Sequence, residues 1–349
     1  MLWGWVLAAI NYGQIQKVAD FIKKMKAGEH GMNFYSFKKD GEEVPALDMY
    51  PPLNHPQAVN FFFFVCAHMY GFWYGDHRGY VAPMYGVVNG KECKGADLVM
   101  KCCTKYLNAG GSFEPEQFAK VTPKELARIF SDDNGPILFP DFETRYQITR
   151  KYGQAFLSLK ITPEQILNGP FRLAHPHFEE RVPLCHVNSS QTPLNDFIGL
   201  TAEYIPGYDK DPLCKKNTLL AMALANRPEH FLKIRPDEKW PLIVDYHLMR
   251  LALRLGVVEL DPLVVKATIE ERVWVNEQTE GEIREAVYLA IDAIISESGK
   301  SMSFVDHLFW SGRKYCPEMT EPECRKCVFC DVCEKHTKLF QPVFRTTAY

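Results

Sequence analysis

Five cysteines crowd into the last part of the chain. Four of them follow the spacing Cys316-x7-Cys324-x2-Cys327-x5-Cys333, and Cys330 lies between the last two. Four thiolates in one loop suit a [4Fe–4S] cluster or a zinc ion, because both bind four cysteine ligands. A leading cysteine followed by a compact triplet favours the iron–sulfur cluster, whereas zinc ribbons pair two CxxC knuckles across a longer spacer. We predict the four spaced cysteines as ligands and Cys330 as a spare; unligated core cysteines are the third alternative.

An acidic residue stands at the start of a helix that we expect over residues 245–256. Asp245 precedes the apolar positions Leu248, Leu251 and Leu255, whose helical spacing would hold it against the core. A carboxylate beside C1′ of a ribose can stabilise the positive charge that develops as the C1′–N bond breaks, or form a transient ester. The helix dipole favours its ionised form. Helix capping alone is the other interpretation, because Asp is a favoured N-cap.

Three further charged residues are candidates for substrate binding. Lys215 and Lys216 open the helix that ends at Asn226 and are candidates to bind a 5′-phosphate. The alternative is that they are ordinary surface lysines. Asp306 is a candidate to bind ribose hydroxyls or an amine on the base, but it also stands three residues after Ser303 in an S-x-x-D capping pattern.

An aromatic run supplies candidate surfaces for a flat base. Residues 61–64 are all phenylalanine, and His68 follows one helical turn after Phe64. Phe64 would offer a stacking face and His68 a polar edge. A purely structural role in the core is the alternative for these phenylalanines.

The pattern of apolar residues, caps and turns predicts a mostly helical chain with a small antiparallel sheet. We expect the sheet within residues 60–95, with a hairpin at Asn89-Gly90. We expect helices over residues 15–26, 97–106, 123–130 (capped by Thr122), 211–226, 245–256, 280–297 and 303–314. Residues 174–195 read as an irregular connection, whose His175-x-His177 and Cys185-His186 have spacing too uneven for a metal site.

Composition places the chain among ordinary globular proteins. Of its 349 residues, 46% are hydrophobic and 24% charged, and no apolar run approaches the roughly 20 residues needed to span a bilayer. Residues 2–10 lack the basic leader and cleavage site of a secretory signal. Scattered cysteines beside one tight cluster are typical of a reducing compartment. We therefore expect a soluble, cytoplasmic protein with no membrane partner.

The net charge disfavours duplex DNA as the main partner. Forty Lys and Arg residues stand against 43 Asp and Glu residues, which gives a formal net charge of −3. Proteins that neutralise duplex phosphates usually carry an excess of positive charge. We divide the chain into an N-terminal α+β region at 1–130, a helical region at 131–315 that carries Asp245, and the cysteine loop with its tail at 316–349.

The end of the chain resembles the endonuclease III-type DNA glycosylases. The resemblance covers residues 304–316 and the cysteine loop, whose first spacer is one residue longer than theirs. Residues 244–250, Val-Asp-Tyr-His-Leu-Met-Arg, resemble the signature that carries the catalytic aspartate of the helix-hairpin-helix superfamily. Lys215-Lys216 matches the place of a Schiff-base lysine in bifunctional members. The Gly-rich hairpin L-P-G-V-G, which grips a DNA backbone in that superfamily, is missing.

A second resemblance covers residues 60–310 and points to the queuosine salvage proteins, the queuosine 5′-phosphate N-glycosylases. It rests on ordered short matches: residues 60–64, 85–110, 121–132, 140–145, Asp245-Tyr246, and Val305-Asp306 with Trp310. The cysteine loop departs from that family, as does His247, where the family has Arg. Both resemblances imply a glycosylase-like helical fold that cleaves N-glycosidic bonds. The second also implies that Tyr246 and Asp306 contact the substrate.

The sequence therefore predicts a mostly α-helical, DNA-glycosylase-like body with a small N-terminal antiparallel β element and a C-terminal iron–sulfur loop. We expect an N-glycosidase acting on a queuosine-type 7-deazaguanine nucleoside or 5′-monophosphate. One alternative is a base-excision DNA glycosylase whose loop touches DNA through Arg313, Lys314, Arg325 and Lys326. The other is a non-catalytic nucleotide- or nucleic-acid-binding protein.

Overall fold

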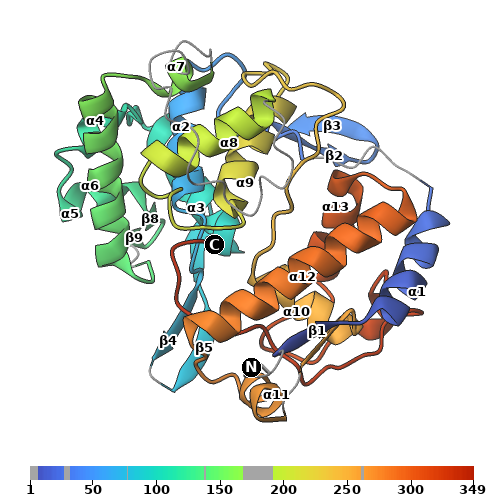
Figure 1. Cartoon of the computed structure of the whole chain (residues 1–349). Helices are drawn as coiled ribbons and strands as arrows, with labels where there is room; N and C mark the ends of the chain where they lie inside the picture. The colour runs from blue at the N-terminus through green and yellow to red at the C-terminus, as the bar shows by residue number, and fades with distance from the viewer. Residues whose placement is uncertain (1–6, 27–31, 77, 137–138, 168–191, 261–262) are drawn as a thin grey trace, which may run out of the picture. The chain divides into compact units, whose positions relative to one another are not determined.

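The structure is a computed structural model that describes residues 7–26, 32–76, 78–136, 139–167, 192–260 and 263–349. As the sequence predicts, the chain is mostly helical with small antiparallel sheets (Figure 1). Most of the expected connection at 174–195, with His175, His177, Cys185 and His186, lies outside the described residues.

The chain divides into two compact units, each made of several segments. Unit 1 contains residues 1–31, 74–82 and 242–345, and unit 2 contains residues 32–73, 83–241 and 346–349. The boundary that we drew after residue 130 falls inside unit 2, and the boundary after residue 315 falls inside unit 1.

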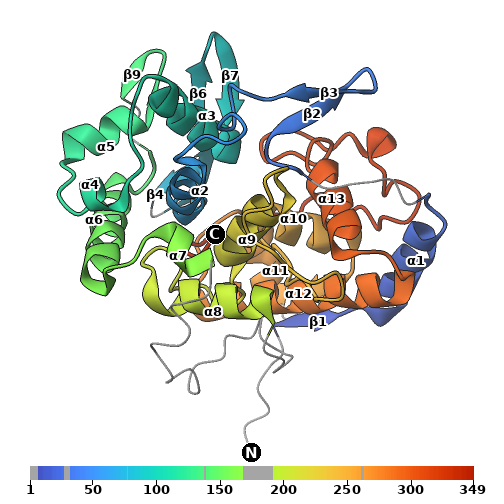
Figure 2. The same cartoon turned by 90° about the horizontal axis from the view of Figure 1, so that it is seen from above.

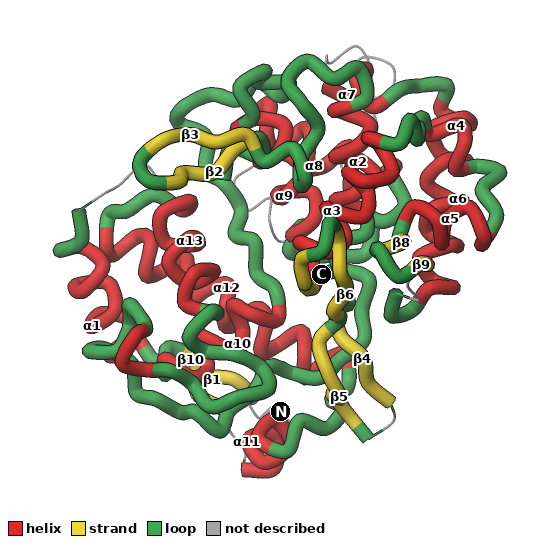
Figure 3. Tube along the Cα trace, turned by 180° about the vertical axis from the view of Figure 1, so that it is seen from behind, coloured by secondary structure: helices red, strands yellow, loops and turns green. Residues whose placement is uncertain are grey.

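Unit 1 is a helical group that includes Asp245 and the cysteine loop. Its elements are β1 (Ala8–Ile10), α1 (Tyr12–Lys23), α10 (Tyr246–Leu255), β10 (Val258–Leu260), α11 (Leu263–Glu270), α12 (Glu277–Ser298) and α13 (Met302–Gly312), with most of the hairpin β4 (Trp73–Asp76) and β5 (Gly79–Pro83). Strand β1 pairs antiparallel with β10, which places Ala9 opposite Glu259 (Figure 3). Helix α12 packs against α1, α10 and α13, so it is the central helix of this unit.

Apolar stripes explain this packing. Helix α1 buries Ile15, Val18 and Ile22, which recur at helical spacing. Helix α10 buries Leu248 and Leu251 on its inner face, as the sequence predicts for the helix that begins after Asp245.

Unit 2 surrounds the short helix α2 and holds the remaining elements (Figure 2). These are β2 (Ser36–Lys39), β3 (Glu42–Pro45), α2 (Ala58–Ala67), β6 (Tyr85–Val88), β7 (Lys91–Lys94), α3 (Gly95–Asn108), α4 (Pro115–Phe118), α5 (Pro123–Ile129), β8 (Ser131–Asp132), β9 (Gly135–Pro136), α6 (Phe142–Leu159), α7 (Pro163–Leu167), α8 (Pro193–Tyr204) and α9 (Lys215–Asn226). Every residue of α2 is buried. Helix α2 contacts α3, α7 and α9, and its four phenylalanines form the centre of an aromatic core.

Local signals placed several elements correctly. Asn89 and Gly90 both have positive φ, at 54° and 69°, as a two-residue hairpin between β6 and β7 requires. Thr122 and Glu125 form the reciprocal capping box at the start of α5.

Other expectations were wrong. Residues 58–67 form helix α2, although we assigned residues 60–95 to a sheet. An all-apolar run has no periodicity that separates a buried helix from a buried strand. Asp211 does not begin a helix; α9 begins at Lys215, after Cys214 in the left-handed conformation. Among the described residues, no helix is both long and apolar enough to cross a membrane.

Candidate functional site

Asp245 is the N-cap of α10, as the capping interpretation predicts. Its Oδ1 accepts hydrogen bonds from the backbone N–H groups of His247 at 2.8 Å and Leu248 at 3.1 Å. The described residues supply no hydrogen-bond partner for Oδ2, and Asp245 is half-buried. One carboxylate oxygen is therefore fixed by the helix, and the side chain as a whole stays partly exposed.

A buried arginine fixes the backbone immediately before Asp245. Arg284, on α12 and 3% exposed, donates from Nε and Nη2 to the carbonyl oxygen of Val244 at 3.1 and 3.0 Å. Arg284 thus fixes the peptide before Asp245, and the Asp245 side chain binds the amides after it. Asp245 is consequently oriented by α10 and α12 together.

A polar face of α10 lies behind the cap. Arg250 donates from Nη2 to Nδ1 of His247 at 3.0 Å, so Nδ1 carries no proton and His247 is assigned the Nε2–H tautomer. Arg250 also donates to the side chain of Gln341 at 2.6 Å, and its Nη1 lies 3.7 Å from the carboxylate of Glu318. Arg250 and Glu318 are both buried, so each offsets the charge of the other.

The side chain of Tyr246 is buried rather than exposed on the surface. It is 6% exposed, and its ring lies 4.2 Å from that of His247. Burial raises the pKa of the Tyr246 hydroxyl, and the carboxylates of Glu318 and Asp245 raise it further. Tyr246 is therefore a neutral side chain next to the cap.

Asp306 lies inside α13 and does not cap it. Ser301 is the N-cap and accepts a hydrogen bond from the N–H of Phe304, so the expected pattern that starts at Ser303 was wrong. Helix α13 packs against α10 in unit 1, and Asp306 is half-buried. Asp306 and Asp245 thus belong to adjacent helices of one unit.

The cysteine loop follows α13 and carries five half-buried thiols. Burial is the main cause that raises the pKa of Cys333 to about 11, and the nearby thiols of Cys327, Cys316 and Cys324 add to it. Burial also raises the pKa of Cys327, and the nearby thiols of Cys316, Cys324 and Cys330 add to it. Which of the five thiols act as ligands therefore stays a prediction.

Arginines of α10 attach this loop to the helix that starts at Asp245. Arg254 donates from Nη1 to Sγ of Cys316 at 3.2 Å and from Nε to the carbonyl oxygen of Leu339 at 2.6 Å. Arg250 donates from Nε to the carbonyl oxygen of Cys316 at 3.0 Å. Neither arginine was predicted to have a role, although both stand on the face of α10 that also carries His247.

The donor chemistry of the loop fits a four-thiolate centre. Five half-buried cysteines lie in this loop, and an N–H donor of Arg254 points at one sulfur, as is common around iron–sulfur clusters. Within the described ranges, however, no group of three or more His, Cys, Asp or Glu side chains has the arrangement of a formed metal site. The cluster therefore stays a prediction.

Lys215 and Lys216 are buried in unit 2, not exposed as the alternative interpretation supposed. Their exposed fractions are 6% and 1%. Lys215 Nζ donates to the carbonyl oxygen of Met69 at 2.9 Å, and Lys216 Nζ to that of Ala67 at 3.1 Å. Burial lowers the pKa of Lys216 to about 7; nearby Asp211 opposes this shift, and Lys215 and Arg145 add to it.

A third buried cation completes this arrangement at the end of α2. Arg145 is fully buried and donates to the carbonyl oxygens of His68 at 2.8 Å, Tyr70 and Pro140, and its guanidinium lies 4.1 Å from the centre of the Tyr70 ring. The carbonyls of residues 67–70 thus all accept from cationic side chains. Carbonyls beyond a helix C-terminus lack helical partners, and the dipole there favours positive charge.

His68 and Phe64 are both in the core of unit 2. The Thr149 hydroxyl donates to the carbonyl of Arg145 and accepts from Nε2 of His68 at 3.0 Å, which leaves Nδ1 of His68 unprotonated. Burial lowers the pKa of His68 well below its usual value. Phe64 is 1% exposed and stacks on Phe118 at 4.3 Å, which favours the core interpretation of the aromatic run.

No protein-family model matches the chain, and neither does any curated protein.

The predicted site residues thus fall into two groups. Asp245, Tyr246, Asp306 and the cysteines belong to unit 1, and Lys215, Lys216, Phe64 and His68 belong to unit 2. Within unit 1, the structure joins the cap to the cysteine loop through one face of α10. Within unit 2, it joins the lysines to the residues that follow α2. Sequence reasoning missed Arg284, because its target is a backbone carbonyl 40 residues away.

Proposed function

We propose that the protein is an N-glycosidase that hydrolyses the bond between ribose and a modified base, most specifically a queuosine-type 7-deazaguanine nucleoside or its 5′-monophosphate. The observation that carries this proposal is the half-buried carboxylate of Asp245, whose Oδ1 is fixed by two amides while Oδ2 has no partner in the described part of the chain. The resemblance to the queuosine salvage proteins supplies the substrate class.

The chemistry follows from the charge that develops at C1′. As the C1′–N bond breaks, the electron pair leaves with the base and the ribose becomes oxocarbenium-like. A carboxylate that is already oriented stabilises this charge without reorganising. Water then adds to C1′, its oxygen becomes the new hydroxyl, and the proton that it loses ends on the departed base. Position 7 of a 7-deazaguanine is carbon and takes no proton in the usual purine manner. Contacts to other atoms of the base, such as O6 and N3, therefore have to stabilise its departure.

The remaining site residues have supporting roles in this proposal. Asp306 contacts the ribose or the base, and the buried ring of Tyr246 packs against His247 next to Asp245. Binding of a 5′-phosphate by Lys215 and Lys216 stays a prediction that this proposal does not use, because both ammonium groups donate to backbone carbonyls inside unit 2. Cys316, Cys324, Cys327 and Cys333 hold the [4Fe–4S] cluster, with zinc as the less favoured metal. Such a cluster would hold the loop together beside α10.

A base-excision DNA glycosylase is the competing enzyme, and the surface of the cysteine loop weighs against it. Arg325 and Lys314 are exposed, but Lys326 is paired with Glu323 and Arg313 lies 3.4 Å over the ring of Trp310. Exposed acids share this loop: Glu321, Glu323, Asp331 and Glu334. Interspersed negative charge reduces the attraction to a polyanion.

The test is to incubate anaerobically purified protein with modified nucleosides, their 5′-monophosphates and duplexes that contain damaged bases, and to identify released bases by mass spectrometry. We expect a free 7-deazaguanine base from a nucleoside or mononucleotide and none from the duplexes. Release of a damaged base from DNA, with submicromolar, salt-dependent duplex binding, would replace this proposal by the DNA glycosylase. Release from no substrate would favour a non-catalytic binding protein.

A further inference from the structure

A groove in unit 2 is unrelated to the residues discussed above. It has a volume of about 480 Å³, and its walls come from β2, the segment 45–49, β7 and α3. Phe37 and Leu47 contribute apolar surface, and Lys91 and Lys101 contribute ammonium groups. This volume falls in the range of ordinary small-molecule sites, about 300–1,000 Å³.

Helix α3 holds one wall of the groove in place. Three side chains on one face of α3 bind residues 47–49: Lys101 donates to the carboxylate of Asp48 at 2.9 Å, Thr104 to the carbonyl of Met49 at 2.8 Å, and Asn108 to the carbonyl of Leu47 at 3.5 Å. The wall is therefore preformed, which lowers the entropy cost of binding a ligand.

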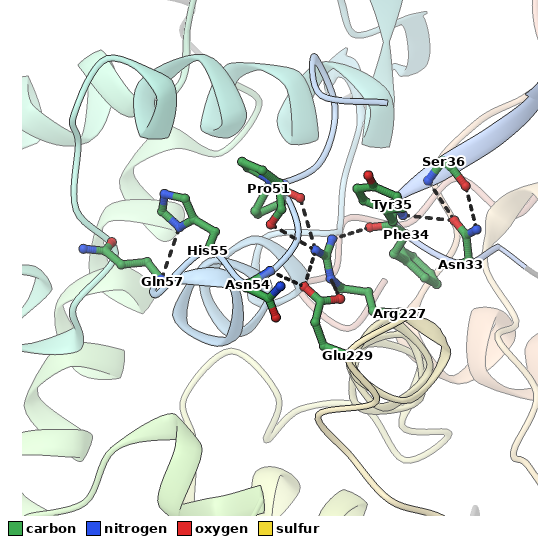
Figure 4. A network of polar contacts seen from close by, with 11 residues as sticks. Asn33, Phe34, Tyr35, Ser36, Pro51, Asn54, His55, Gln57, Arg227 and Glu229 are labelled. Carbon is green, nitrogen blue, oxygen red and sulfur yellow. Dashed lines mark hydrogen bonds and ion pairs between the residues drawn. The ribbon is translucent and has the colours of Figure 1, made fainter. Parts of the chain in front are cut away.

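A buried arginine secures both ends of the segment that contains this wall (Figure 4). The fully buried Arg227 donates to the carbonyl of Phe34 at 2.7 Å and to the carbonyl of Pro51 at 3.2 Å, and it is paired with Glu229 at 2.8 Å. Residues 34 and 51 bracket the β2–β3 hairpin and the wall. The groove is thus anchored at its ends and along its middle.

The groove contains large apolar side chains that are not buried in the core. Phe37 is 51% exposed and Leu47 48% exposed, and both line the same hollow. Among the described residues, Phe37 makes no ring–ring contact. Phe37 and Leu47 are therefore the apolar surface against which a ligand in this groove would lie.

The charge in the groove is positive. Lys91 is exposed, and its ammonium group has no hydrogen bond or ion pair within the described residues. Lys101 uses one of its three donors on Asp48, so these three groups together carry one net positive charge. An aromatic face beside two ammonium groups fits a flat ring that carries an anion.

We propose that this groove binds a mononucleotide, with the base against Phe37 and the phosphate at Lys91 and Lys101. This site is additional to the glycosidase site at Asp245 and does not depend on it. The base gains an aromatic contact that is tolerant of base identity. The phosphate gains charge-assisted hydrogen bonds.

The experiment is photo-crosslinking with 8-azidoadenosine 5′-monophosphate, followed by mass-spectrometric mapping of the labelled peptides. We expect the label on peptides that contain residues 34–52 or 85–101, and we expect AMP to compete for the site much better than adenosine or inorganic phosphate. Labelling confined to other peptides would overturn the proposal. Equal competition by adenosine would overturn the assigned role of the phosphate.

Two variants with matched controls sharpen the result. Phe37→Ala should weaken AMP binding roughly 10-fold, as loss of one stacking contact implies. Lys91→Met should weaken it by a similar factor, roughly 10-fold, for one charge-assisted hydrogen bond. The exposed residues Leu157 and Lys124 lie in unit 2 but do not line the groove, so Leu157→Ala and Lys124→Met should leave binding unchanged. Equal affinity of the groove variants and their controls would contradict the proposal.

Discussion

Two helices, α10 in unit 1 and α9 in unit 2, begin at charged residues that the sequence marks as candidates, Asp245 for catalysis and Lys215 and Lys216 for binding a phosphate. At α10, Asp245 caps the helix with one oxygen and leaves the other without a described partner. At α9, Lys215 and Lys216 are buried and donate to the carbonyls that follow α2. A charged residue at a helix start can therefore either bind a ligand or form hydrogen bonds with the backbone of another helix. The half-buried Asp245 fits the first role, and the buried Lys215 and Lys216 fit the second.

The largest effect that we predict concerns the loop attached to α10. Cys327→Ser should abolish the iron content and the absorption near 400 nm of anaerobically prepared protein, because a [4Fe–4S] cluster needs its four cysteine ligands. Cys330→Ser is the matched control and should retain about four irons per chain. Stoichiometric zinc without iron in the wild-type protein would contradict the cluster, and loss of iron in the control would contradict the ligand set.

The next largest effect concerns the cations at the end of α2. Arg145→Ala should destabilise unit 2 by about 3–5 kcal/mol, because it leaves buried carbonyls without partners. Urea denaturation followed by peptide-level hydrogen exchange measures this change and locates it. Lys151, also on α6, is exposed, so Lys151→Ala serves as the control. A loss below about 1 kcal/mol would show that these carbonyls do not need Arg145.

Lys216, on α9, should make the stability of unit 2 depend on pH. Its pKa is about 7 in the folded chain, below the ordinary lysine value of 10.5. Between these values the unfolded chain binds more protons, so the free energy of unfolding should rise with pH, by at most about 1.4 kcal/mol per pH unit. Lys216→Met should flatten the profile measured by urea denaturation above pH 7. An unchanged slope in that variant would assign the dependence to another group.

The smallest effect separates capping from chemistry at α10. Asp245→Ala should lower stability by about 1 kcal/mol, whereas Asp245→Asn should cost only a few tenths, since an amide oxygen also accepts from the helix amides. Thermal unfolding of the two variants measures the difference. Equal losses of about 1 kcal/mol would show that the cap requires the charge and not only the acceptor.

Features set by neighbouring residues were predictable from the sequence. The Asn89-Gly90 hairpin, the Thr122 capping box and the Asp245 cap each depend on residues within a few positions of one another. A short stretch of sequence therefore contains both the donor and the acceptor of each hydrogen bond. The mostly helical fold follows in the same way from apolar spacing.

Features set by distant residues were not predictable. Lys216 is buried because its ammonium meets the carbonyl of Ala67, 149 positions away, and no property of residues 211–226 reveals that partner. Arg284 acts on the carbonyl of Val244, which has no side-chain signal at all. The groove beside Phe37 combines β2, residues 45–49, β7 and α3, so only the fold brings its ring and its lysines together.

The central claim is that Asp245 stabilises the positive charge that develops on the ribose and also caps α10. The most direct test is the rate of base release from the preferred nucleoside or mononucleotide by the wild-type protein and by Asp245→Asn, with hydrogen exchange at the amides of residues 247 and 248 as the check on the cap. The account predicts a loss of at least roughly 100-fold with little change in exchange, because an amide still caps but cannot offset an oxocarbenium charge. Release within a few-fold of the wild-type rate would contradict it and leave Asp245 as a cap alone.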